Sequence, residues 1–251
     1  MNTLRFRLLA KDVLVGTFCA IPHPMTVEMT ADAGWDFIVI DAEHSQIDRG
    51  DFEPLLRASQ PTPALFRLPG LDSIWINSAL DAGAAGVLLP RVNTAAEARA
   101  AVAATRYPPV GERGVGPGRA SGYGTRIERA IADNANTVLA VQIESAQGLA
   151  NIDEIAAVEG IDTLYIGPGD LALSLGAMGP AGRPVLERAI ATIVASCKRH
   201  GRPVGTFCMT PDHLAQSIAQ GMTFVTLGSD SVFLGRALKD AAIAAKKAGG
   251  K

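Results

Sequence analysis

Residues 138–176 read VLAVQIESAQGLANIDEIAAVEGIDTLYIGPGDLALSLG, two short apolar runs with a helical pattern between them. The runs Val138–Ile143 and Thr163–Ile166 are short and rich in β-branched residues, which is typical of buried strands. An acidic residue follows each run: Glu144 after the first and Asp170 after the second. Because the carboxyl ends of neighbouring parallel strands lie side by side, we expect these two carboxylates to lie close together.

Two interpretations of this acidic pair are open at this point. Glu144 and Asp170 could each cap the helix that follows its strand. Alternatively, they could share one hard divalent cation, since carboxylate oxygens are the ligands that such ions prefer. Gln142 points to the same side of its strand as Glu144, because side chains alternate along a strand. A third polar group beside the two acids favours the interpretation as a cation site over the interpretation as two helix caps.

Composition limits the classes of partner. Apolar residues make up 48% of the 251 residues and charged residues 19%, as in a globular protein. The 23 basic side chains nearly balance the 25 acidic ones, so we expect no binding to nucleic acid or to an anionic membrane. No apolar run is long enough to cross a membrane and no secretory signal is recognisable, so we expect a cytoplasmic protein. Cys19, Cys197 and Cys208 lack the paired spacing of a zinc site and are expected to be buried thiols.

Strand and helix patterns alternate along almost the whole chain. Eight such units favour a (β/α)₈ TIM barrel over an open doubly wound sheet, and we expect one barrel domain over residues 1–251. The predicted strands are Val13–Cys19, Phe37–Ile40, Ala64–Leu68, Gly86–Leu89, Val138–Ile143, Thr163–Ile166, Pro203–Phe207 and Phe224–Leu227. The predicted helices are Thr3–Ala10, Thr26–Ala33, Asp51–Ala58, Ser73–Ala82, Thr94–Thr105, Arg126–Ala135, Leu149–Val158, Pro184–His200, Pro211–Gln220 and Asp230–Lys247.

One long loop interrupts this alternation. Residues 107–125 read YPPVGERGVGPGRASGYGT and are followed by the helix that begins near Arg126. Loops of this length in a compact domain usually have a function or are mobile. With its glycines and with Arg113, Arg119 and Arg126, the loop could form a lid that faces an anion or a contact between subunits; the plainer alternative is a flexible insert with solvated arginines.

The other predicted strand ends carry groups suited to acid–base chemistry. His44 directly follows an apolar strand in the sequence IDAEH, so it enters an acidic cluster. A neighbouring carboxylate orients an imidazole and raises its basicity, as a general base near neutral pH requires. Asp81 ends a predicted helix, where the helix dipole disfavours an acid. A partner for Asp81 is therefore expected, and His44 is a candidate.

Arg67 lies between Phe66 and Leu68, an unfavourable place for a permanent charge unless the arginine meets an anion. That anion could be a substrate carboxylate, a developing enolate, or a carboxylate of the chain such as Asp41 or Asp170. Arg91 suggests the same role more weakly. No lysine ends a central strand, which disfavours a Schiff-base mechanism.

Several motifs together resemble a known family. They are IDAEH, FRLP, LLPRVNTAAEARAAVAATRYPPVGERGVG, VQIES and IDTLYIGPGDLALSLG. In this order they resemble the class II, metal-dependent pyruvate aldolases of the HpcH/HpaI aldolase/citrate lyase family, over residues from about Gly16 to Leu238. The resemblance implies a TIM barrel of the phosphoenolpyruvate/pyruvate superfamily. It also implies reversible cleavage of a 4-hydroxy-2-oxo acid to pyruvate and an aldehyde through a pyruvate enolate.

The resemblance assigns roles to the candidate catalytic groups. It implies that His44 moves the proton, that Asp81 raises the basicity of His44, and that Arg67 stabilises the enolate. Glu144 and Asp170 correspond to the metal ligands, and the ion would be Mg²⁺, Mn²⁺ or Co²⁺. The residues expected to bind substrate are Gln142, Gly167, Pro168 and Gly169 for the pyruvyl group, and Phe18, Arg91 and Phe207 for the aldehyde portion.

Two other functions remain as alternatives. One is a lyase of the same superfamily that acts on acyl-CoA esters of the malyl-CoA or citryl-CoA type, for which only the loop of Arg113–Arg126 offers a basic surface. The other is a barrel that binds ligands without catalysis. The resemblance also implies a homo-oligomer, commonly a hexamer, in which the helix Asp230–Lys247 is exchanged between neighbouring barrels.

Overall fold

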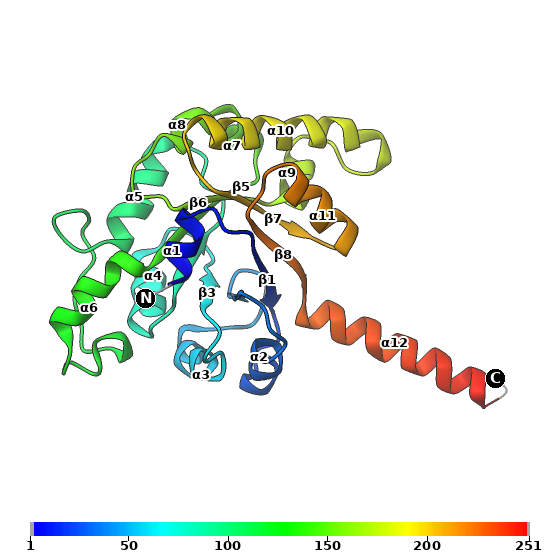
Figure 1. Ribbon diagram of the computed structural model, residues 1–251, viewed down its shortest axis with the longest axis horizontal. Helices are drawn as coiled ribbons and strands as arrows, with labels where there is room; N and C mark the ends of the chain where they lie inside the picture. The colour runs from blue at the N-terminus through cyan, green and yellow to red at the C-terminus, as the bar shows by residue number, and fades with distance from the viewer. Residues whose placement is uncertain (1–2, 250–251) are drawn as a thin grey trace.

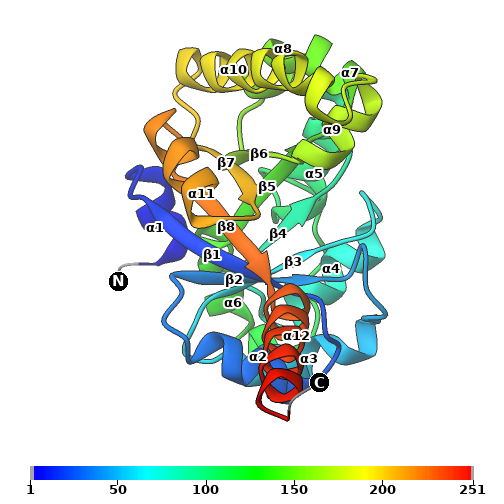
Figure 2. The ribbon, with the colours of Figure 1, turned by 90° about the vertical axis from the view of Figure 1, so that its right-hand side faces the viewer.

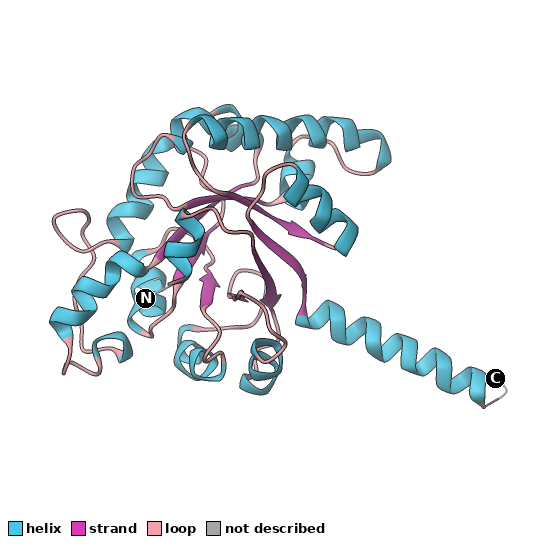
Figure 3. Ribbon diagram, in the orientation of Figure 1, coloured by secondary structure: helices cyan, strands magenta, loops and turns pink. Residues whose placement is uncertain are grey.

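The computed structural model describes residues 3–249 and contains a closed barrel of eight parallel strands in chain order, shown in magenta in Figure 3. Each strand pairs with the next along the chain, and β8 pairs with β1. The predicted (β/α)₈ barrel is therefore confirmed. The strands are β1 Leu14–Cys19, β2 Phe37–Asp41, β3 Ala64–Arg67, β4 Gly86–Leu89, β5 Val138–Ile143, β6 Thr163–Ile166, β7 Val204–Cys208 and β8 Phe224–Ser229.

Helices surround the barrel. Figure 2 shows α7, α8 and α10 on one side and α2 and α3 on the opposite side. The helices are α1 Leu4–Leu9, α2 Pro24–Ala31, α3 Phe52–Ala58, α4 Ser73–Asp81, α5 Ala95–Thr105, α6 Ile127–Asp133, α7 Ala146–Ala150, α8 Ile152–Ala156, α9 Pro168–Ser174, α10 Arg183–Arg199, α11 Pro211–Ala219 and α12 Asp230–Ala248. Because each helix between two strands runs back along the barrel, its last turn lies at the amino-terminal end of the strands.

The helices differ from the sequence-based prediction in two places. The predicted helix Leu149–Val158 is two short helices, α7 and α8, which meet at Asn151. The side-chain amide of Asn151 donates to the carbonyl oxygen of Asn93 at 2.7 Å, a tertiary contact at the point where the helix is divided. Helix α9 was not predicted. It begins at Pro168, within a glycine-rich segment whose composition resembles a loop.

The core has an inner and an outer layer. The inner layer fills the barrel, where the rings of Phe37 and Phe224 stack with their centroids 4.1 Å apart. Leu4 and Leu8 of α1 belong to the same layer, so this helix closes the amino-terminal opening. The outer layer packs the strands against the surrounding helices. The barrel interior is thus filled, which leaves the carboxyl ends of the strands as the place for a site.

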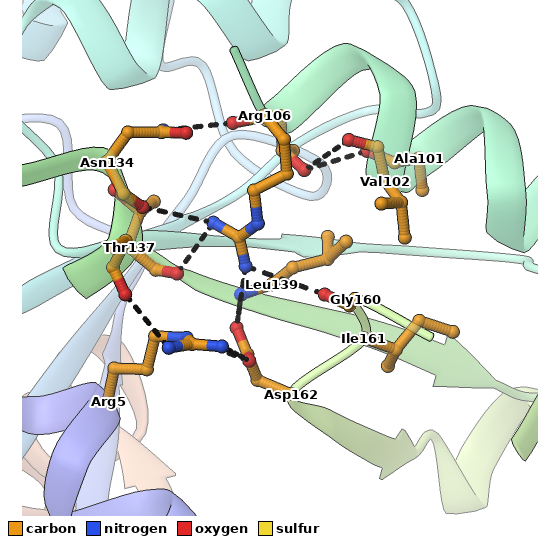
Figure 4. Close-up of polar contacts among 12 residues, drawn as sticks. Arg5, Ala101, Val102, Arg106, Asn134, Thr137, Leu139, Gly160, Ile161 and Asp162 are labelled. Carbon is orange, nitrogen blue, oxygen red and sulfur yellow. Dashed lines mark hydrogen bonds and ion pairs between the residues drawn. The ribbon is translucent and has the colours of Figure 1, made fainter. Parts of the chain in front are cut away.

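A buried ion-pair cluster joins several elements at the amino-terminal end of the barrel (Figure 4). The carboxylate of Asp162, just before β6, accepts hydrogen bonds from Arg5 Nε at 2.9 Å, Arg106 Nη2 at 2.9 Å and the backbone N–H of Leu139 at 2.8 Å. Burial lowers the pKa of Arg106, and the charge of Asp162 opposes this shift. A buried charge with several partners avoids the large desolvation cost of an unpaired one. The cluster thereby connects α1, the end of α5, β5 and β6.

The long loop lies at this same end. Arg113 Nη2 donates to Asp81 Oδ1 at 2.7 Å, and Arg119 Nη1 donates to the carbonyl oxygen of Ala82 at 2.9 Å. Both acceptors are at the end of α4. The hydroxyl of Tyr123 reaches Arg57 Nη2 of α3 at 2.6 Å. The loop is therefore bound to the amino-terminal end of its own barrel, and the interpretation as a lid over the strand ends of the same chain is wrong.

Helix α12 extends away from the barrel (Figure 1). Only its beginning packs on the barrel, where the ring of Phe233 stacks on Trp35 at a centroid distance of 6.4 Å. Farther along, Leu234, Leu238 and Ile243 are exposed. None of the helices between residues 3 and 249 has the length and apolar character needed to cross a membrane.

Candidate active site

A cavity of about 360 Å³ opens at the carboxyl ends of the strands. A second hollow, of about 540 Å³, adjoins it, and Asp170 lines both. Arg91 and Glu144 line this second hollow. Most of the residues predicted from sequence therefore meet at one end of the barrel. The first cavity is lined by Phe18, Ala20, Asp41, His44, Arg67, Gln142, Tyr165, Gly167, Pro168, Gly169, Asp170, Phe207, Ser229 and Ser231.

The carboxylate of Glu144 is hydrogen-bonded on both oxygens. Its Oε1 accepts from the backbone N–H of Arg91 at 2.8 Å, and its Oε2 accepts from the side-chain amide of Gln142. Ser145, and not Glu144, caps helix α7 through its hydroxyl. The capping interpretation of Glu144 is therefore wrong. Burial raises the pKa of Glu144, and the negative charge of Asp170 raises it further.

Asp170 also does not act as a cap. It lies in the first turn of α9, which has Gly167 as its N-cap and no side-chain capping bond. A Cβ atom at Gly167 would lie 2.5 Å from Glu144 Oε2 and 2.7 Å from Gln142 Nε2, so only glycine allows the backbone this close to the pair. The start of α9 therefore packs directly on the Glu144 carboxylate.

The donor atoms at this place suit a hard divalent ion. Gln142 Oε1 is buried and has no hydrogen-bond partner among residues 3–249. Glu144 and Asp170 supply carboxylate oxygens next to it, whose mutual repulsion a cation would relieve. Within the described chain no three His, Cys, Asp or Glu side chains are grouped to hold a metal. Two carboxylates would leave coordination positions open for substrate, as a catalytic site requires.

Arg67 is fixed on one side by a carboxylate and on another by an aromatic ring. Its Nε donates to Asp41 Oδ1 at 2.8 Å and its Nη2 to Asp41 Oδ2 at 2.6 Å, a bidentate pair. Its guanidinium carbon lies 4.7 Å from the centre of the Phe18 ring. Burial acts to lower the pKa of Arg67, but the hydrogen bonds and charge of Asp41 outweigh it and the pKa is raised. Arg67 therefore stays charged inside the cavity.

His44 lies beside a half-buried acid, Glu43, at the edge of the cavity. Its side chain is 54% exposed, and its Nε2 is 3.7 Å from Glu43 Oε2, which is itself 3.4 Å from Arg67 Nε. Burial raises the pKa of Glu43, while the charge of Arg67 acts in the opposite direction. The backbone N–H groups of Glu43 and His44 both donate to Asp41 Oδ1. Asp41 thus orients both the loop of His44 and the side chain of Arg67.

Asp81 is the one predicted catalytic residue that lies elsewhere. As the last residue of α4 it is at the amino-terminal end of the barrel, where it pairs with Arg113. His44 follows β2 at the opposite end. The structure therefore does not bring Asp81 and His44 of one chain together. The position of Asp81 at the end of a helix already implied this separation, because such helices end at the amino-terminal end of the barrel.

Some lining residues were not predicted. Asp41 was considered only as a partner of Arg67, and Tyr165 was hidden inside an apolar strand. The hydroxyl of Tyr165 bonds to Thr226 at 2.5 Å, and burial raises its pKa, so this phenol is neutral. Ser229 and Ser231 lie where β8 ends and α12 begins. The polar residues at the end of β8 and just after it were the available signal for these two serines.

Comparison with known proteins agrees with this geometry. The model of the HpcH/HpaI aldolase/citrate lyase family matches residues 14–237. The chain belongs to this family. Among its HpcH/HpaI relatives is the 5-keto-4-deoxy-D-glucarate aldolase of Klebsiella pneumoniae, which is 40% identical over 232 residues, 91% of each chain. The family and aldolase chemistry predicted from the sequence are confirmed.

Solved structures of similar proteins superpose closely on the barrel. A family protein from Burkholderia cenocepacia is 34% identical with a TM-score of 0.93, covering 98% of this chain and 100% of that chain. Macrophomate synthase is 28% identical with a TM-score of 0.87, covering 99% of this chain and 90% of that one. The family fold therefore extends over essentially the whole chain.

The close approach at Gly167 provides a test of the site. We expect Gly167→Ala to displace the Glu144 carboxylate and to lower kcat/KM for aldol cleavage about 100-fold, the usual cost of a 1 Å misplacement in an active site. Steady-state kinetics would measure the loss. Gly50→Ala is the matched control: no atom lies within 4 Å of the added Cβ and Gly50 lines neither hollow, so activity should be nearly unchanged. Equal activity of both variants would contradict the proposed placement of Glu144.

Proposed function

We propose that this HpcH/HpaI protein is a divalent-metal-dependent aldolase that reversibly cleaves a 4-hydroxy-2-oxo acid to pyruvate and an aldehyde. The observation that carries the proposal is that Glu144 and Asp170 lie together at the cavity that contains Arg67. The relatives named 5-keto-4-deoxy-D-glucarate aldolase support a keto-deoxy sugar acid as the substrate class. The basic loop that an acyl-CoA lyase would need lies at the opposite end of the barrel, which disfavours that alternative.

Glu144 and Asp170 would hold the ion, and Mg²⁺, Mn²⁺ and Co²⁺ suit their hard oxygen donors. A divalent cation held there would draw electron density from the 2-oxo group and so lower the free energy of the enolate. The Gln142 amide and the backbone of Gly167, Pro168 and Gly169 lie beside the two carboxylates and would orient the pyruvyl group.

Arg67 would stabilise the negative charge that develops on the pyruvyl oxygen. Its orientation is fixed before substrate arrives, because Asp41 holds two of its nitrogens and Phe18 lies against the guanidinium. Donors that are oriented in advance need no rearrangement when the charge appears, which is how such groups lower a barrier. The N–H groups of the guanidinium that Asp41 does not engage would then bind the substrate.

His44 would accept the proton of the C4 hydroxyl, directly or through water. As that proton leaves, the C3–C4 bond breaks, C4 becomes the aldehyde carbon, and the bonding electrons remain on the pyruvate enolate. Protonation of the enolate at C3 then gives the methyl group of pyruvate. Phe18 and Phe207 meet edge to face with centroids 5.7 Å apart and would bound the space for the aldehyde portion.

Metal removal tests the proposal. We expect the protein with Mg²⁺ or Mn²⁺ to exchange the methyl protons of pyruvate in D₂O, and EDTA to abolish the exchange, because enolate formation needs the cation. Proton NMR of pyruvate would follow the reaction. Exchange that continues at the same rate in EDTA would contradict metal dependence, and no exchange with either ion would contradict the aldolase itself.

A histidine substitution tests the proton transfer. We expect His44→Asn to lower the rate of aldol cleavage about 10²- to 10⁴-fold, the usual contribution of a general base. His23→Asn is the control, because His23 caps α2 outside the cavity and asparagine is a good capping residue. Cleavage rates that do not differ between the two variants would remove His44 from the mechanism.

We also propose a homo-oligomer, a hexamer as the family resemblance implies, that exchanges α12 between barrels. The support is the extended position of this helix and its exposed side chains Leu234, Leu238 and Ile243, an apolar face that a second copy would cover. Asp81 is far from His44 of its own chain, so Asp81 would act on the imidazole of His44 in a neighbouring subunit. Arg113 would hold the Asp81 carboxylate in place for that contact.

Complementation tests this arrangement. His44→Asn and Asp81→Asn should each lower cleavage, and mixed oligomers of the two variants should regain activity, because some sites would combine an intact His44 with an intact Asp81. Light scattering would give the mass of the assemblies. A monomeric mass, or an oligomer without any recovery in the mixture, would contradict the shared site.

A further inference from the structure

The carboxylate of Asp230 is buried at the point where β8 ends and α12 begins. Asp230 is the first residue of α12, and only 8% of it is exposed. Its Oδ1 accepts hydrogen bonds from the backbone N–H of Ala20 at 2.8 Å and of Ser231 at 2.7 Å, and its Oδ2 accepts from the backbone N–H of Ile21 at 3.1 Å. One side chain thus joins the start of α12 to the loop that follows β1.

No basic side chain neutralises this carboxylate. Within residues 3–249 no side-chain nitrogen of a lysine, arginine or histidine lies within 4.0 Å of its oxygens. A buried charge without an ionic partner is unfavourable unless hydrogen bonds and a helix dipole compensate it. The amino-terminal end of α12 supplies the dipole, and the loop supplies two N–H groups. The loop and Asp230 therefore depend on each other for their positions.

The loop that Asp230 holds is part of the cavity wall, although Asp230 itself does not line the cavity. Ala20 lines the cavity of about 360 Å³ together with Phe18 of β1, and so do Ser229 and Ser231 on either side of Asp230. The strands follow chain order around the closed barrel, so β1 and β8 lie across the ring from β5 and β4. This wall therefore lies opposite the strand end that carries the proposed metal ligand, on the side of Phe18, where the aldehyde portion would bind.

We infer that Asp230 is a positioning residue for the aldehyde half of the reaction: it fixes the loop after β1, and this loop bounds the space beside Phe18. The inference rests on the proposed aldolase function and adds to it a residue that touches neither substrate nor metal. The two sides of the cavity have separate supports, because Gly167 packs on the Glu144 carboxylate at one side and Asp230 holds the loop at the other. A change at Asp230 therefore affects the aldehyde and leaves pyruvate unaffected.

The test compares two reactions of the same protein loaded with Mg²⁺: the condensation of pyruvate with propanal, and the exchange of pyruvate methyl protons in D₂O. Asp230→Asn leaves one acceptor oxygen in place of two and turns an NH₂ group toward a loop N–H. We expect this variant to raise the KM of propanal about 10-fold, near the effect of one lost methylene-sized contact in a pocket. The kcat of condensation and the rate of proton exchange should both stay near wild type, because the enolate forms at the opposite wall.

Two further variants complete the experiment. Asp230→Glu keeps both acceptor oxygens and should raise the KM of propanal less than Asp230→Asn does. Asp32→Asn is the matched control, since Asp32 is exposed at the end of α2 and lines neither hollow, and its KM should equal that of the wild type. Light scattering and thermal unfolding would compare the mass and the fold of each variant with those of the wild type.

An unchanged KM of propanal overturns the inference. An equal loss in condensation and in proton exchange overturns it as well, because a general structural role of Asp230 would affect both reactions alike. If Asp230→Asn does not fold, the same two criteria apply to Asp230→Glu. Absence of proton exchange in the wild-type protein would instead contradict the aldolase proposal, so the two failures are distinguishable.

Discussion

The position of the Glu144 carboxylate is the constraint on which the catalytic end of the barrel depends. The backbone of Arg91 and the amide of Gln142 bind its two oxygens, and the bare Cα of Gly167 lies against it. These contacts come from the ends of β4, β5 and β6, so one side chain sets the spacing of three neighbouring strand exits. The left-handed turn at Arg91 and the entry of α9 at Gly167 both follow from it.

The acidic groups at this end of the barrel are only partly paired with basic ones. Asp41 neutralises Arg67, but the buried Oε2 atom of Glu43 lacks a hydrogen bond, and the charge of Asp170 disfavours ionisation of Glu144. Such an arrangement is unfavourable in isolation and becomes favourable when a cation and an anion enter together. A chelating 2-oxo acid with a divalent ion has this combination of charges, in agreement with the proposed function.

The strands could be predicted from sequence because they are apolar, short and bounded by turns; Gly86–Leu89, Val138–Ile143 and Thr163–Ile166 agree to the residue. Strand exits then located His44, Arg67, Glu144 and Asp170, since a parallel barrel gathers them at one end. The sequence could not show how far apart two residues lie when they are not on neighbouring strands. Asp81 was therefore matched with a histidine that lies at the opposite end of its own barrel, and α9 was missed because Gly167–Gly169 has the composition of a loop while its backbone is fixed by tertiary contact.

The buried cluster around Asp162 has a consequence for how this barrel can change. Arg5, Arg106 and Leu139 are tied together at the end opposite the cavity of their own barrel, so these stabilising groups are separate from the residues that line the cavity. A reserve of stability at one end permits strained or unpaired groups at the other. Evolution or a protein engineer could therefore exchange the residues that contact the aldehyde, and redirect the enzyme to new carbon skeletons, without rebuilding the scaffold.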